Sequence, residues 1–101
     1  MMKIKKTLNG KDMTLELEGY LDTTTSPELK KLLGETMDSI DTLTLDFQNL
    51  EYVSSAGLRV LLMAHKTMEE KGGMKILHVN EVIMDALNIT GLANVLHVEK
   101  A

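Results

Sequence analysis

Apolar and polar residues alternate in two blocks near the start of the chain. The first block covers Met2–Leu8, and the second, Met13–Leu21, places an apolar or small residue at every other position. A period of two residues is typical of strands that bury one face. Asn9-Gly10 lies between the blocks and is a common hairpin turn. The pattern therefore predicts two antiparallel strands that are neighbours in a sheet.

The next segment changes to a helical period. Two arrangements are open for its start: Thr25 and Glu28 form a capping box, or Ser26 caps a helix that opens with Pro27. Either arrangement predicts a helix that ends near Ser39. The apolar residues on one face of this helix recur with the helical period. They are Leu29, Leu32, Leu33, Met37 and Ile40.

Two further strands and a long helix follow. Leu43–Phe47 alternates and predicts a third strand. The broad apolar stripe of residues 56–71 predicts a second helix, which Gly72-Gly73 ends. Met74–Val79 is a short apolar run between turn signals, so it predicts a fourth strand.

The last part of the chain completes the order of elements. Asn80 is a suitable cap for a third helix, which Thr90-Gly91 ends, and Val95–Val98 is a candidate edge strand. The order β-β-α-β-α-β-α(-β) calls for parallel strands joined by right-handed crossovers. We therefore predict an α/β fold, a mixed sheet of four to five strands with three main helices packed on it. Because no repeat or linker interrupts the chain, residues 1–101 are expected to form one domain.

Composition excludes several classes of function. The 101 residues include 15 acidic and 11 basic side chains, a net charge of -4, and only 3% are aromatic. Such a chain lacks the basic surface and the stacking platforms that bind nucleic acid. It has no cysteine, which excludes disulfides and thiol catalysis. No apolar stretch is long enough to cross a bilayer, so we expect a cytoplasmic protein without membrane insertion.

Two adjacent hydroxyls mark the place where an extended run becomes the second helix. Ser54 or Ser55 is a suitable N-cap, and Gly57 follows closely. The same position favours a phosphate group, because unpaired N–H groups and the helix dipole attract negative charge. A serine phosphorylated there would change surface charge without melting the helix. The residues alone leave both roles open.

Three segments, in order along nearly the whole chain, resemble the STAS domain and, within it, the bacterial anti-sigma factor antagonists. They are Leu17–Asp22, Leu43–Asp46 and Val53–Leu58. The last is similar to the family's Asp-Ser-Ser-Gly-Leu signature. The resemblance implies that Ser55 is the phosphorylated serine, and that Ser54 stands where the family has aspartate.

The resemblance also implies partners and a mechanism. The chain would bind an anti-sigma factor that is also a serine kinase, which releases the sigma factor, and phosphorylation by that kinase would end the binding. The runner-up is a STAS module that is never phosphorylated and acts as a scaffold or as the partner of a transport system. In both cases we expect a monomer with no cofactor and no enzymatic activity. The expected contact residues are Asp22, Thr23, Ser54, Ala56, Gly57, Leu58 and Arg59.

Ordinary structural roles compete with these functional ones. Asp22 suits an Asx turn ahead of the first helix. Arg59 suits a solvated helix surface as well as an interface anchor or a phosphate partner. Asp46 suits the outward face of an alternating strand. Ala56 and Gly57 are small enough to let a partner's backbone approach closely.

Other chemistries lack their sequence patterns. The three histidines, His65, His78 and His97, fall on different predicted elements without metal-ligand spacing, so no metal site is predicted. No Gly-x-Ser-x-Gly elbow surrounds the serines, which argues against a serine hydrolase. Gly72-Gly73 lacks the remainder of a phosphate-binding loop and is explained by the end of a helix.

Overall fold

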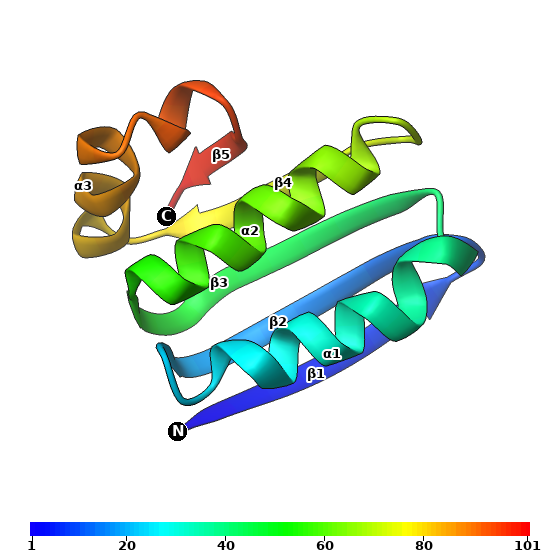
Figure 1. The fold of residues 1–101 in the computed structure, drawn as a ribbon, viewed down its shortest axis with the longest axis horizontal. Coiled ribbons are helices and arrows are strands. Elements are labelled where there is room, and N and C mark those ends of the chain that lie inside the picture. Colours follow the sequence, from blue (N-terminus) through cyan, green and yellow to red (C-terminus); the bar gives the residue numbers. More distant parts are fainter.

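Five strands form one mixed sheet in which the spatial order follows the order along the chain (Figure 1). The computed structural model describes residues 1–101. The strands are β1 (Met2–Asn9), β2 (Asp12–Leu21), β3 (Thr42–Val53), β4 (Met74–Val79) and β5 (His97–Lys100). The helices are α1 (Ser26–Thr36), α2 (Ser55–Met68) and α3 (Glu81–Ile89), with short 3-10 turns at η1 (Met37–Ser39) and η2 (Leu92–Asn94).

The strand directions confirm the predicted topology. β1 and β2 form an antiparallel hairpin closed at Asn9 and Asp12, where Gly10 adopts the left-handed φ of 66° that this turn requires. The pairs β2–β3, β3–β4 and β4–β5 are all parallel. Each of these parallel pairs is joined by a segment that contains a helix. The α/β mixed sheet with three main helices is therefore confirmed.

The helices and the sheet form two layers. In Figure 1, α1 lies in front of β1 and β2, α2 lies in front of β3 and β4, and all three helices begin at the same edge of the sheet. The core fills the space between the layers and is almost entirely aliphatic. Its members with no exposed surface include Leu15, Leu33, Leu45, Phe47 and Leu61. One edge of the sheet therefore gathers every strand-to-helix junction.

Strand β3 is longer than the alternation predicted. Its buried positions run through Leu43, Leu45 and Phe47 and then resume at Leu50 and Val53. The interval changes because the pairing with β2 shifts register in this part of the strand, which is typical of a β-bulge. The simple alternation stops at Phe47 while the strand continues to Val53.

The start of α1 differs from both predicted arrangements. Thr25 occupies the N-cap position, but its side chain makes no capping hydrogen bond. Ser26 is the first residue of the helix, and its hydroxyl donates to the backbone oxygen of Asp22. Both capping predictions are therefore wrong, because these hydroxyls bond to backbone oxygens of the preceding turn. The helix gives way to η1, which ends at Ser39 as the apolar pattern predicted.

None of the three helices is both long and apolar enough to cross a membrane.

Candidate functional site at the ends of β2 and β3

The two strands that carry the sequence motifs end side by side. Leu21 and Val53 are paired residues at the C-terminal ends of β2 and β3. The backbone N–H of Ser54 donates to the backbone oxygen of Leu21 at 2.9 Å. Because α1 follows β2 after residues 22–25 and α2 follows β3 after Ser54 alone, the sheet register brings Asp22 and the Ser54-Ser55 pair to neighbouring junctions.

The β2–α1 junction is a network of hydrogen bonds within residues 20–26. Asp22 Oδ1 accepts from the backbone N–H groups of Thr24 at 2.9 Å and Thr25 at 3.0 Å. Thr25 Oγ1 donates to the backbone oxygen of Tyr20 at 2.7 Å and accepts from the N–H of Asp22 at 2.9 Å. The predicted Asx turn is therefore confirmed.

The same contacts favour the ionised form of Asp22. The N–H of Thr25 stabilises the carboxylate and holds the pKa of Asp22 below its usual value. Partial desolvation opposes this shift, and the N–H of Thr24 adds to it. The carboxylate is directed into its own turn and holds the loop that ends at α1. Thr23, next to it, is exposed.

The β3–α2 junction depends on fewer polar contacts. Ser54 is the N-cap of α2, with extended backbone angles (φ -86°, ψ 175°), and its Oγ accepts from the N–H of Gly57 at 3.4 Å. This bond is longer than most hydrogen bonds to nitrogen. Ser55 is the first residue of α2 and is exposed, whereas Ser54 and Ala56 are half-buried. Of the two serines that the sequence left open, Ser54 is the cap.

Gly57 and Leu58 lie in the interior rather than on the contact surface that the sequence suggested. Leu58 is 7% exposed, and Gly57 is buried. A Cβ at Gly57 would be 2.8 Å from Leu21 Cγ, 2.9 Å from Val53 Cγ1 and 3.0 Å from the backbone oxygen of Leu21. The glycine thus allows the first turn of α2 to pack on the ends of both strands. Its small size serves this internal contact.

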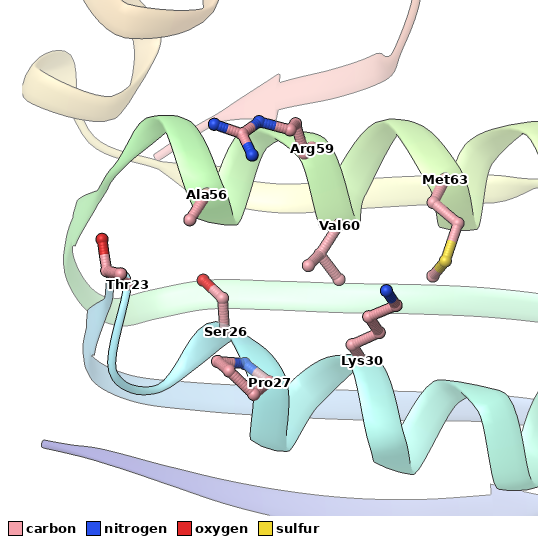
Figure 2. Close-up of a pocket in the computed structure, with 8 residues that line it drawn as sticks. All are labelled: Thr23, Ser26, Pro27, Lys30, Ala56, Arg59, Val60 and Met63. Atoms are coloured by element: carbon pink, nitrogen blue, oxygen red, sulfur yellow. The ribbon is translucent and has the colours of Figure 1, made fainter.

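A groove of about 420 Å³ separates α1 from the first turns of α2. Figure 2 shows Thr23 and Ser26 at the end nearest the junctions, with Ala56 opposite them on α2. Arg59, from α2, is exposed at the rim. Lys30 lines the groove from α1, and the sequence did not indicate it as a candidate contact residue. Its proximity to α2 depends on how the two helices pack, which no local pattern encodes.

Several residues weighed from the sequence lie outside this site. The three histidines occupy α2, β4 and β5, as predicted. Asp46 lies on β3, accepts from the N–H of Gln48 at 3.0 Å and contacts His78 Nδ1 at 2.9 Å. No group of three or more potential metal ligands gathers in the structure.

Comparison with known proteins decides the family. A family model described as "Mlab, STAS domain" matches residues 4–98. The chain belongs to the STAS domain family. The family suggested by the three sequence motifs is therefore confirmed.

Two named relatives are similar to most of this STAS domain. An anti-sigma F factor antagonist of Paenibacillus polymyxa is 29% identical over 87 residues, which cover 83% of this chain and 74% of the relative. An anti-sigma-B factor antagonist of Staphylococcus aureus (strain NCTC 8325 / PS 47) is 28% identical over 101 residues, covering 98% of this chain and 94% of the relative.

Solved structures share the fold of this STAS domain at lower identity. An anti-sigma factor antagonist from Mycobacterium paratuberculosis superposes with a TM-score of 0.89 at 19% identity, over 100% of this chain and 87% of the other. The phosphorylated form of the Bacillus cell fate determinant SpoIIAA superposes with a TM-score of 0.74 at 15% identity, over 97% and 90% of the two chains.

Proposed function

We propose that the chain is an anti-sigma factor antagonist, and that phosphorylation of Ser55 by its anti-sigma factor, a serine kinase, ends the binding. The names of the relatives support the antagonist role. The proposal that phosphorylation ends the binding rests on Ser55. This residue is exposed at the first position of α2 and lies within the segment that resembles the family's signature. The proposal gives the chain no catalytic role of its own.

A phosphate on Ser55 is compatible with the fold. Ser55 Oγ takes no part in the capping contact, which is made by Ser54. The N-terminal turn of a helix favours a negative group. The phosphate would add about -1.5 to -2 charge to a chain whose net charge is -4, giving roughly -6. The modification would thus alter the surface at the junction and leave the core intact.

The proposed contact surface is centred on exposed residues beside Ser55. Thr23 and Arg59 are exposed, and Ser54 and Ala56 are partly accessible. Asp22 supports this surface by ordering the loop that carries Thr23. Gly57 and Leu58, which are buried, support it from below. A charge added at the centre of such a surface is costly to desolvate when a partner covers it.

Mass spectrometry tests the acceptor directly. The purified chain is incubated with ATP and a serine kinase encoded beside it, and we expect the intact mass to increase by one phosphate. The Ser55→Ala variant should show no increase. Phosphate on another residue, or no phosphate after incubation with an active kinase, would contradict phosphorylation of Ser55 as the regulatory step. Absence of phosphate would favour the alternative function, a STAS module that is never phosphorylated. The replacement of the family's aspartate by Ser54 beside the acceptor would then explain the loss of phosphorylation.

Binding measurements test the consequence of the charge. Ser55→Asp should weaken binding to the kinase by about tenfold or more, because an interface that excludes water disfavours an unpaired charge. Ser55→Ala should bind like the wild type. Asn88→Asp is the matched control, since Asn88 is an exposed residue of α3 and the change adds the same charge away from the junction. If Ser55→Asp and Ser55→Ala both bind like the wild type, the assignment is wrong.

A further inference from the structure

The groove between α1 and α2 has the opposite charge to the chain as a whole. Lys30 and Arg59 line it, and a neighbouring hollow along α2 shares Arg59 and Met63 and adds Lys66. No aspartate or glutamate lines either depression. In a chain with more acidic than basic residues, this is a local concentration of positive charge.

These three cations have no acidic partner in the protein. The one ion pair that involves a lysine or arginine joins Lys5 to Glu16 at 3.9 Å, on the β1–β2 hairpin, and the other three pairs involve histidines. Lys30, Arg59 and Lys66 are all exposed. Their charges are therefore available to groups outside the chain.

The floor of the groove is apolar. Ala56, Val60 and Met63 follow one another at helical spacing along α2 and line the groove, with Pro27 on the α1 side. Figure 2 shows Val60 and Met63 directed into the space between the helices and the amine of Lys30 reaching across from α1. Val60 is 7% exposed and Met63 is half-buried, so only part of the apolar floor is accessible. The surface combines an apolar stripe with a cationic rim.

We propose that this groove binds an acidic, amphipathic segment of a partner protein. Apolar side chains of the segment would lie on Val60 and Met63, and its carboxylates would face Lys30, Arg59 and Lys66. A groove of about 420 Å³ accommodates a few side chains of such a segment rather than an entire helix. Charge complementarity selects this occupant, because a basic segment would be repelled by every charged group that lines the groove.

The groove extends the proposed partner surface but does not depend on phosphorylation. Ala56 lines its end and is the residue after Ser55, so a phosphate on Ser55 would lie beside the groove. An added negative charge there would repel an acidic segment. The proposal rests on the proposed function only for the existence of a protein partner.

A synthetic peptide of about 15 residues tests the groove. Leucines at helical spacing supply its apolar face and glutamates fill the other positions, while a matched peptide carries lysine for glutamate. Titration of the ¹⁵N-labelled chain should shift amide signals of α1 and α2 around Lys30, Val60 and Met63 with the acidic peptide alone. Raising the salt concentration should weaken this binding.

Paired charge reversals locate the binding. The Lys30→Glu, Arg59→Glu double variant should lower the affinity for the acidic peptide by about tenfold or more. The control, Lys11→Glu with Lys75→Glu, changes the net charge equally at exposed lysines outside the groove. Equal loss in both variants would overturn the proposal, as would equal binding of the two peptides. The same shifts produced by inorganic phosphate would also overturn it, by indicating a simple anion site.

The two proposals fail separately. Ser55→Ala should keep its affinity for the acidic peptide, since the groove residues are unchanged. Ser55→Asp should bind the peptide more weakly, and a normal affinity in that variant would remove the link between Ser55 and the groove. Absence of phosphorylation at Ser55 leaves the peptide result unaffected, and absence of peptide binding leaves the mass measurement unaffected.

Discussion

The β2–α1 and β3–α2 junctions lie next to each other and perform the same task by different means. Each turns the chain from the end of a parallel strand into a helix on the same face of the sheet. In the first, the side chains of Asp22, Thr25 and Ser26 all bond to backbone groups of the turn. In the second, the side-chain contribution is one 3.4 Å bond from Gly57 to Ser54, and packing at the glycine fixes the rest.

The β2–α1 junction therefore acts mainly as a support, whereas the β3–α2 junction presents an accessible surface. A turn whose carboxylate and buried hydroxyls are engaged with its own backbone holds its shape, and it offers a partner only its exposed Thr23 and Thr24. A turn fixed by packing beneath the backbone leaves its outward side chains free. Ser55 belongs to the second kind. In the β2–α1 turn, we expect substitutions to lower stability when they remove a hydrogen bond. In the β3–α2 turn, we expect them to lower stability when they add side-chain volume.

The largest effect is expected at Gly57. Gly57→Ala should lower the free energy of unfolding by about 2–3 kcal/mol, because the new methyl group would overlap Leu21 and Val53. Urea denaturation followed by circular dichroism measures the change. Gly34→Ala is the matched control: Gly34 lies within α1 with no atom near its added Cβ, so alanine should stabilise by up to about 1 kcal/mol. Equal effects at the two glycines would show that the β3–α2 junction accommodates an added methyl group without strain.

Thr25 tests the polar junction. Thr25→Val keeps the volume but removes the hydroxyl, which leaves the oxygen of Tyr20 and the N–H of Asp22 without their partner. We expect a loss of about 1–2 kcal/mol in the free energy of unfolding, since Thr25 is buried. Thr24→Val in the same loop should change it by no more than about 0.5 kcal/mol, because Thr24 is exposed. If the two valines behave alike, the network contributes no stability.

The sequence predicted the elements better than their connections. Periodicity identified both strands of the hairpin and all three helices, because burial of one face imposes the same spacing wherever the element lies. It also identified Asn80, whose Oδ1 accepts from the N–H of Ile83 at 2.8 Å. It was wrong about the caps at Thr25 and Ser26. A hydroxyl at these positions can accept from an N–H of the helix or donate to a backbone oxygen of the preceding turn, and only the path of that turn decides between them.

The sequence predicted residues of the candidate site but not which of them are exposed on its surface. Ser55 and Arg59 are exposed, in keeping with a contact role, whereas Gly57 and Leu58 are not. A glycine that allows a partner to approach and a glycine that allows a strand to approach look the same in a sequence. Lys30 was missed because its place beside α2 arises from helix packing, across residues far apart in the chain.

The two neighbouring serines of the β3–α2 junction are expected to differ in their effect on stability. Ser54→Ala should lower the free energy of unfolding by about 0.5–1 kcal/mol through loss of the cap, at the low end of such effects because the bond is long. Ser55→Ala should leave it nearly unchanged, since Ser55 is exposed and is not the cap. Urea denaturation of both variants measures the difference. A larger loss at Ser55 would mean that its hydroxyl serves the fold rather than the surface.

The smallest effect on stability is expected when the pH is lowered and Asp22 in the β2–α1 junction becomes protonated. The N–H of Thr25 lowers the pKa of Asp22 in the folded chain, so the ionised carboxylate adds stability above its unfolded-state pKa of about 3.9. That contribution is lost as the pH falls through the lower, folded-state pKa. Asp22→Asn is the control, because the amide oxygen can accept the same bonds without titrating. The wild type should lose stability relative to Asp22→Asn below about pH 4, as measured by urea denaturation at each pH. A constant difference from pH 7 to pH 2 would show that the charge of Asp22 does not hold the turn.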